Sequence, residues 1–264
     1  MARDDLPAHT SATQLSTYAS CPRRYAYRYI EHRAAEQRAP GLALGTALHG
    51  AIGWYLQERA EEREPALDDV LRIVRADLAA ALANDAIRWP VGTTPASLRV
   101  EAERLLRLFL STHGDLAVKE LELRFDFVIV DPVSGEQMPR PMIGYFDVEL
   151  ASGNLIELKT AKRAYSATAL RAGLQFGAYR TAAAYLGVDV QLLALVRKKQ
   201  PVVQHVVLPR DRDVSAWFMR AAASIERAIL AGHFPPAPGA TCPGCEFRRA
   251  CLGVEAEVAD AEAA

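Results

Sequence analysis

The sequence predicts an α/β fold with a helical N-terminal part. Before residue 116 the apolar residues recur at the spacing of amphipathic helices, whereas from residue 118 they alternate with polar residues as in a strand. A Ser-Gly-Asn turn then separates two short alternating runs, which is the pattern of a β-hairpin. A helical segment and further strands follow, and this order of elements is typical of an α/β chain.

The helical part is expected to cover residues 11–115. Ser11 is one of several hydroxyl residues that can cap its first helix, and Pro22 opens a second helical turn directly after Cys21. A longer helix that contains His49 follows and ends before a proline. The three longer helices of this part are expected at 42–64, 66–87 and 96–113.

The sheet is expected in a core over 116–210. Its first strand is predicted at 118–130, with one apolar face made of Leu121, Leu123, Phe125 and Phe127. After the hairpin, a helix is expected at 167–186 and strands at 191–197 and 201–208. A helix at 215–232 and a cysteine-containing segment complete 211–253, so that residues 1–253 form one domain. The Ala/Glu-rich tail at 254–264 has the composition of a disordered segment.

The hairpin from Gly144 to Lys159 carries an unusual pattern of charge. A three-residue loop at Ser152–Asn154 would pair Val148 with Leu158 and Leu150 with Ile156, which gives one apolar face. The other face would then carry Asp147 opposite Lys159 and Glu149 opposite Glu157. A loop with an even number of residues would scatter these charges over both faces, so the interpretation predicts an odd-numbered loop.

Carboxylates that lie opposite each other destabilise an ordinary sheet and raise the pKa of one of them. A bound cation removes that penalty, and oxygen ligands of this kind suit Mg²⁺ or Mn²⁺. The alternative is a solvated edge of charged residues. The combination of Asp147, Glu157 and Lys159 favours the metal site, because the ion would activate water and the lysine would orient it.

The cysteines predict a second metal site. The chain has four of them, a lone Cys21 and then a C-x2-C-x5-C group. Disulfides are rare in the cytosol, where clustered thiols more often bind metal. Four thiolates suit either structural zinc or an iron–sulfur cluster.

Composition narrows the class of protein further. The net charge is −1, so any contact with nucleic acid must use local basic patches. No apolar run reaches the about 18 residues of a membrane span, and the first residues lack the layout of a signal peptide. We therefore expect a cytoplasmic protein without membrane contact. No phosphate-binding loop of the G-x4-G-K-[ST] type is present, so any unwinding of DNA would need another protein.

The motif Gly144-x-x-Asp147…Glu157-x-Lys159 resembles the active-site hairpin of the PD-(D/E)XK nuclease superfamily. It is similar in particular to the hairpin of the RecB-like exonucleases and their single-domain relatives in CRISPR adaptation. Gln175-x3-Tyr179 resembles the Q-x3-Y motif of that branch, and His49 sits where these families place an upstream histidine. The resemblance implies a restriction-endonuclease-like core, a mixed central sheet flanked by helices.

The resemblance also implies the roles of individual residues. Asp147, Glu157, His49 and the carbonyl of Leu158 would hold the metal, and Lys159 would be the catalytic lysine. An imidazole ligand tilts the choice toward Mn²⁺. Two further residues would lie over the site and touch DNA or orient the lysine, namely Gln175 and Tyr179. A glutamate of the preceding strand would be an additional ligand, with Glu120 preferred and Glu122 as the alternative.

The cysteine layout resembles that of the [4Fe–4S] members of this branch, with zinc as the rival. The cluster would join Cys21 to Cys242, Cys245 and Cys251 and act as a structural staple. Nearby arginines would then converge into a patch for a phosphate backbone, namely Arg23, Arg24, Arg28, Arg248 and Arg249. Tyr25, Tyr27 and Phe247 would stack on bases there. The alternative is that these residues form a solvated rim and part of the core.

Together these features predict a metal-dependent DNA nuclease, an exonuclease on single strands or DNA ends in recombination, repair or CRISPR adaptation. A helicase or CRISPR adaptation proteins would be its partners. The alternative from another class is a non-catalytic iron–sulfur subunit that binds DNA or serves as a scaffold. An endonuclease that trims flaps or spacer precursors is a third reading of the same site.

Overall fold

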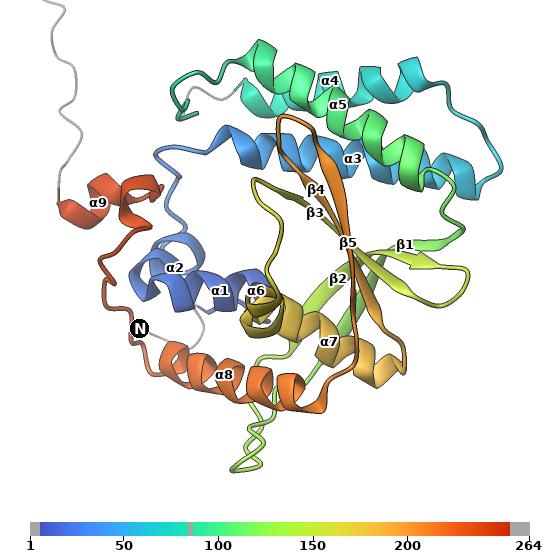
Figure 1. Cartoon of the computed structure of the whole chain (residues 1–264). Coiled ribbons are helices and arrows are strands. Elements are labelled where there is room, and N and C mark those ends of the chain that lie inside the picture. Colours follow the sequence, from blue (N-terminus) through green and yellow to red (C-terminus); the bar gives the residue numbers. More distant parts are fainter. Residues whose placement is uncertain (1–5, 84–86, 254–264) are drawn as a thin grey trace, which may run out of the picture.

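The computed structural model describes residues 6–83 and 87–253, and the predicted tail at 254–264 lies outside them. Within these residues one sheet has the strand order β1-β2-β3-β4-β5, and helices cover both of its faces (Figure 1). None of the described helices is long and apolar enough to cross a membrane. The predicted α/β class, with a mixed sheet behind N-terminal helices, is confirmed.

The N-terminal part is helical as expected. Its helices are α1 (Ala12–Ser20), α2 (Pro22–Tyr29), α3 (Pro40–Ala60), α4 (Leu67–Leu82) and α5 (Pro95–His113). The side chain of Ser11 caps α1 by accepting a hydrogen bond from the amide of Gln14, and Pro22 opens α2. Helix α3 begins two residues before the predicted start, because Pro40 is well suited to the first position of a helix.

The core alternates strands and helices as predicted. The strands are β1 (Val118–Phe127), β2 (Met142–Leu150), β3 (Leu155–Ala161), β4 (Val190–Val196) and β5 (Val202–Leu208). The remaining helices are α6 (Ala167–Ala172), α7 (Leu174–Leu186), α8 (Arg212–Leu230), the 3₁₀ helix η2 (Cys242–Gly244) and α9 (Arg248–Leu252). The single helix predicted at 167–186 is wrong, because Gly173 adopts an extended conformation and separates α6 from α7.

Two hydrophobic layers hold the helices to the sheet. Helices α3, α4 and α5 pack on one face against Val148, Ile156 and Leu158. Helices α1, α7 and α8 pack on the other face, where Phe146 and Phe218 are fully buried. Strands β3 and β4 are parallel, and the α6–α7 pair connects them across this second face.

The hairpin loop is odd-numbered as predicted, but its register is shifted by two residues. Val148 pairs with Ile156 and Glu149 with Leu155, in place of the predicted pairs of Val148 with Leu158 and Leu150 with Ile156. The turn is at Ala151–Gly153, because Gly153 has φ +83° and takes the left-handed position that ends a three-residue loop. A two-residue shift of register does not by itself move a side chain to the other face of the sheet, so Val148 and Ile156 still share one apolar face.

Strand β1 departs from simple alternation at Glu122. The predicted apolar face included both Leu121 and Leu123, but these residues pack in different hydrophobic clusters, on opposite sides of the sheet. Glu122 has φ +53°, a conformation that side chains rarely adopt. At Glu122 the side chains of β1 therefore switch from one side of the sheet to the other. The switch lies next to the pair of Leu121 with Val148.

A buried ion pair fixes the end of the β1–β2 connection. Nε and Nη2 of Arg140 donate to the two carboxylate oxygens of Glu226 on α8, at 2.9 Å and 2.8 Å. The side chains are 7% and 0% exposed. Arg140 also donates to the hydroxyl of Tyr25 on α2, so this pair joins the loop to two helices from opposite ends of the chain.

Candidate functional site

The predicted catalytic residues meet where β2 and β3 separate. Beyond the pairs Val148–Ile156 and Glu149–Leu155, the two strands no longer share a ladder. The carboxylate of Asp147 occupies the gap, and its Oδ2 accepts a hydrogen bond from the amide of Leu158 at 2.6 Å. Leu158 thus contributes its amide to this site, and its carbonyl as a metal ligand stays a prediction.

Glu157 is the most deeply buried acidic group of the hairpin, at 1% exposure. One carboxylate oxygen pairs with the ammonium of Lys159, whereas Oε2 is buried without a hydrogen-bond partner. Burial raises the pKa of Glu157 to about 7, and the positive charge of Lys159 opposes part of this rise. A buried carboxylate oxygen without a partner is costly, so this position favours a cation.

Lys159 and Tyr179 keep their protons in this arrangement. Burial alone would lower the pKa of Lys159, but the carboxylates of Glu157 and Asp147 raise it. Burial and the neighbouring Glu157 raise the pKa of the Tyr179 hydroxyl. Gln175 donates from Nε2 to this hydroxyl at 3.0 Å, so α7 places both predicted residues over the hairpin.

Asp147 has a lowered pKa although it lies in a buried setting. Burial by itself raises the pKa of this carboxyl, but His49, the amide of Leu158 and the charge of Lys159 together lower it. His49 reaches the site from α3, with Nδ1 3.7 Å from Oδ1 of Asp147. A cavity of about 860 Å³ brings His49, Asp147 and Lys159 to one surface, and we call it the hairpin groove.

The two glutamates of β1 are placed differently with respect to the hairpin groove. Both are exposed, but of the two only Glu122 lines the groove together with Asp147, and a role of either glutamate as a metal ligand stays a prediction. The difference follows from the left-handed conformation of Glu122, which turns this part of the strand. The alternation of the sequence predicted both glutamates on one face of β1. No local sequence pattern indicated the left-handed conformation at Glu122.

The donor set fits a hard divalent cation, although the side chains do not form a closed ligand shell. In the described part of the chain, no group of three or more His, Cys, Asp or Glu side chains is gathered closely enough to hold a metal ion. The chemistry of the donors still matches the ion, because the Asp147 carboxylate lies beside the His49 imidazole and Oε2 of Glu157 is buried without a partner.

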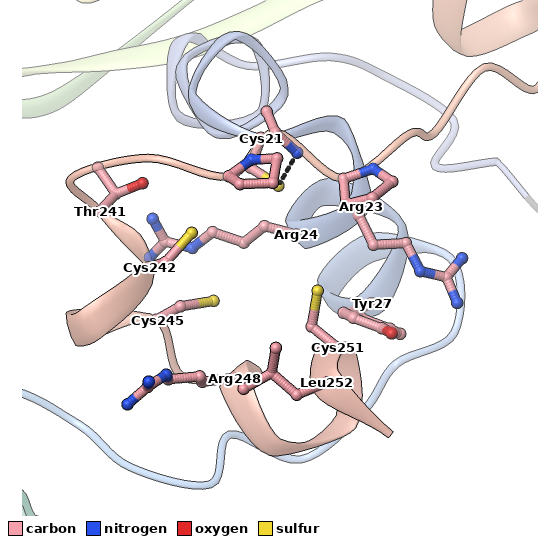
Figure 2. A pocket seen from close by; sticks show the side chains of 13 residues that line it. Cys21, Arg23, Arg24, Tyr27, Thr241, Cys242, Cys245, Arg248, Cys251 and Leu252 are labelled. Atoms are coloured by element: carbon pink, nitrogen blue, oxygen red, sulfur yellow. Dashed lines mark hydrogen bonds between the residues drawn. The ribbon is translucent and has the colours of Figure 1, made fainter. Parts of the chain in front are cut away.

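The four cysteines line one further cavity, of about 220 Å³. Figure 2 shows their side chains arranged around this space, with Cys21 entering between α1 and α2 and the others from the C-terminal segment. The amides of Ala237 and Gly239 donate to the sulfurs of Cys21 and Cys242, at 3.5 Å and 3.3 Å. Residues more than 200 positions apart in sequence therefore meet here, as the cysteine pattern predicted.

Protein contacts also hold the cysteine segment onto α2. The buried carboxylate of Glu246 pairs with Arg24 at 2.8 Å and with Arg28. Glu36 accepts hydrogen bonds from the amides of Arg249 and Ala250, both at 3.0 Å. These contacts join the N- and C-terminal segments through side chains other than the cysteines.

The predicted arginine patch is only partly formed. Arg24 and Arg28 form ion pairs with Glu246. Arg23 forms an ion pair with Glu31, and its guanidinium lies over the ring of Tyr27. Arg248 lines the cysteine cavity, and Arg248 and Arg249 are exposed. These two are therefore the members of the patch that stay candidates for phosphate contact.

The prediction that aromatic residues here stack on bases is wrong. Tyr25, Tyr27 and Phe247 are 0%, 5% and 2% exposed, so their faces are closed to a ligand. Phe247 packs against Tyr27 with ring centroids 5.6 Å apart. Tyr25 packs in a separate cluster with Tyr18 and Ile229. The three rings are therefore core residues, which is the structural alternative considered from the sequence.

Comparisons with known proteins find a similar fold. The fold is similar to the crystal structure of a "Putative exonuclease" from Eubacterium rectale, with a TM-score of 0.56 and 9% identity over 92% of this chain and 88% of that one. The structure of SSO0001 aligns with 92% of this chain and 94% of its own at 14% identity, but its TM-score of 0.37 is too low to support an argument. No curated protein matches the sequence significantly.

The comparison with protein families is decisive for membership. A family model described as the PD-(D/E)XK nuclease superfamily matches residues 9–252, which include the hairpin, α3, α7 and all four cysteines. The chain therefore belongs to the PD-(D/E)XK nuclease superfamily.

Proposed function

We propose that this protein is a metal-dependent deoxyribonuclease, an exonuclease on single-stranded DNA or DNA ends. The observation that carries the proposal is the hairpin itself. Glu157 is fully buried with one oxygen unpartnered and the other paired with Lys159, and Asp147 lies between His49 and the amide of Leu158. Members of this superfamily typically use a divalent metal, and these residues supply the oxygen and nitrogen ligands that Mg²⁺ or Mn²⁺ requires.

The residues of the site have different roles in phosphodiester hydrolysis. Asp147, Glu157 and His49 hold the ion, and the amide of Leu158 keeps the Asp147 carboxylate in place. When bound, the ion lowers the pKa of the attacking water and withdraws charge from the phosphoryl group. Lys159 keeps its proton beside the two carboxylates, so it acts as a fixed positive charge that orients the nucleophile and the phosphate oxygen.

Gln175 and Tyr179 position this lysine. Tyr179 lies with its ring centroid 6.0 Å from the Lys159 ammonium, and its hydroxyl receives a hydrogen bond from Gln175. A hydroxyl whose pKa is raised stays a donor toward Glu157 at neutral pH. The pair thereby restricts Lys159 and Glu157 to one arrangement, which electrostatic catalysis requires.

The second part of the proposal concerns the cysteines. They bind a [4Fe–4S] cluster, which assigns the chain to the RecB-like iron–sulfur branch of the superfamily. All four thiols line one cavity, and backbone amides already point at two of the sulfurs. Iron and acid-labile sulfide in equal amounts are expected in protein purified without oxygen. Zinc without sulfide would contradict this assignment and leave the hairpin site unaffected.

Cleavage assays test the nuclease. We expect the wild-type protein to degrade labelled linear single strands with Mn²⁺ or Mg²⁺ and to lose this activity in EDTA. Substrates blocked at the 5′ or the 3′ end give the polarity, and a circular single strand separates exonuclease from endonuclease. Cleavage measured in the presence of a helicase or of CRISPR adaptation proteins then tests whether the protein acts with either partner.

Isosteric variants give the sharpest test of the catalytic residues. Asp147→Asn keeps an oxygen for the amide of Leu158, and Glu157→Gln keeps the buried volume, so both should fold and yet lose cleavage. Lys159→Met keeps the aliphatic stem and should retain Mn²⁺ binding, measured by calorimetry, while cleavage is lost. Full activity in the Lys159→Met protein would refute the role of the lysine.

The non-catalytic alternative has a distinct outcome. A DNA-binding or scaffold subunit would bind the same labelled strands with or without Mn²⁺ and leave them intact. Binding without cleavage by the wild-type protein under all metal conditions would therefore replace the nuclease proposal with this alternative.

A further inference from the structure

A third cavity, at the N-terminal end of α3, is lined by four basic side chains. It measures about 400 Å³, and we call it the basic cavity. Its basic residues are Arg38, Arg88, Lys162 and Arg197. Among the described residues that line it, none is acidic. In a chain with a net charge of −1, such a cluster is a departure from the general charge balance.

The fold explains why these residues meet. Arg38 lies just before α3, and its carbonyl accepts a hydrogen bond from the amide of Arg88 at 2.9 Å. Lys162 directly follows β3 and Arg197 directly follows β4. Because β3 and β4 are parallel, with Ala161 beside Val196, their carboxyl ends deliver both side chains to one edge of the sheet.

Two of the four charges already have partners. Arg197 forms a bidentate pair with Glu101 at 2.9 Å and 2.6 Å, and Arg88 donates to the carbonyl of Pro243. For Arg38 and Lys162, the described residues provide no ion pair, and both side chains are exposed. Their positive charges are therefore available to an anion that enters the cavity.

The basic cavity adjoins the hairpin groove. Gly41 lines both of them, and Lys162 lies only three residues beyond the predicted catalytic Lys159. From Gly41 to His49 the axis of α3 rises about 12 Å. At about 3.4 Å per nucleotide of a stacked strand, this corresponds to about three or four nucleotides.

We propose that the basic cavity binds a backbone phosphate of the strand whose reacting phosphate lies at the Asp147–Lys159 site. This inference rests on the proposed nuclease function and adds a second contact point to it. The cavity holds the strand about three or four nucleotides from the scissile bond. Because phosphate contacts position a strand and carry no sequence information, the anchor is independent of base sequence.

The test measures binding and not cleavage. A fluorescently labelled single strand is titrated without added Mg²⁺ or Mn²⁺ at several salt concentrations. Each lost phosphate contact lowers the magnitude of the slope of log affinity against log salt by about 0.7. The double variant Arg38→Gln, Lys162→Gln removes the one proposed contact, so its slope should fall by about 0.7. Arg163→Gln is the matched control, because this neighbouring cation is exposed and does not line the cavity.

Each outcome has a defined meaning. An unchanged slope and affinity in the double variant would overturn the inference, and so would an equal loss in Arg163→Gln. A loss confined to strands with a 5′-phosphate would assign the cavity to a terminal phosphate and overturn the backbone assignment. Thermal unfolding of each variant excludes a folding defect.

Failure of the inference can be separated from failure of the proposed function. If the wild type cleaves DNA and the double variant binds strands as the wild type does, only the basic cavity is excluded. If the wild type neither binds nor cleaves strands, both proposals fail together.

Discussion

Gly144→Ala should disturb both the stability and the activity of the protein. Gly144 pairs with Phe125 across β1 and β2, and a Cβ at this position would lie 2.4 Å from Cζ of the phenylalanine ring. Carbon atoms in contact are about 3.5 Å apart or more, so the ring must move by about 1 Å. The ring has little room, because it packs against Phe146 and Tyr179 with centroids 4.8 Å and 6.1 Å away.

The expected cost follows from this overpacking. Extra methylene groups in a packed core cost about 1–3 kcal/mol, and we take about 2 kcal/mol for this site. In a chain of this size that corresponds to a fall of about 4–8 °C in Tm. Cleavage should fall as well, because Phe125 pushes on Tyr179, which lies beside Glu157.

Thermal unfolding and a cleavage assay on the same preparations check this prediction. Gly53→Ala is the stability control, because no atom lies within 4 Å of its added Cβ and the position is inside α3. That variant should gain about 0.5–1 kcal/mol. Adding Phe125→Leu to Gly144→Ala should recover part of the lost stability. Unchanged Tm and activity in Gly144→Ala would refute the reasoning.

Three further predictions concern the free energy of unfolding. Glu226→Gln should lower the free energy of unfolding, measured in urea, by about 3 kcal/mol, because it leaves buried Arg140 without its charged partner. If the losses of stability in Glu226→Gln and Arg140→Met simply add in the double variant, the two side chains are not coupled and the prediction is wrong. Glu246→Gln should cost about 2 kcal/mol, because it leaves Arg24 and Arg28 without their charged partner. If the cysteines bind a metal as proposed, a chelator should also remove it faster from this variant, and an unchanged rate would contradict the prediction. Burial lowers the pKa of His113 below 6.5, so the unfolded state binds more protons and stability falls as the pH drops below 6.5. Thermal unfolding at several pH values should show a smaller fall in His113→Gln.

Much of the fold was predictable because its signals are local. Apolar spacing marked α3 and α5, and alternation marked β1 and the hairpin. The break at Gly173 was missed because the apolar spacing continues through it from α6 to α7. A Cβ there would lie 2.7 Å from the carbonyl oxygen of Ala169, a crowding that only the folded backbone reveals.

For the candidate site, the sequence predicted which side chains share a face of the hairpin, but it did not predict which residues pair across the two strands. The parity of the hairpin loop put Asp147 and Glu157 on one face, and a two-residue shift does not change this. The position of Glu122 at the hairpin groove depends on its left-handed conformation within a strand, which no local sequence pattern indicates. The contribution of Arg38 and Arg88 to the basic cavity arises from tertiary contacts between distant segments, so no spacing in the chain indicates it.

The narrow join between β2 and β3 gives the molecule a weak line through its sheet. Strand β3 pairs with β4 along its whole length, but it meets β2 only at Val148–Ile156 and Glu149–Leu155. The Asp147 carboxylate, bonded to the amide of Leu158, replaces a missing rung of the ladder. Local opening along this line needs few broken bonds, so exchange of the Leu158 amide with solvent deuterium should report it. Such opening parts Asp147 from Glu157 while both half-sheets stay folded, and heat should therefore abolish cleavage before the helices melt.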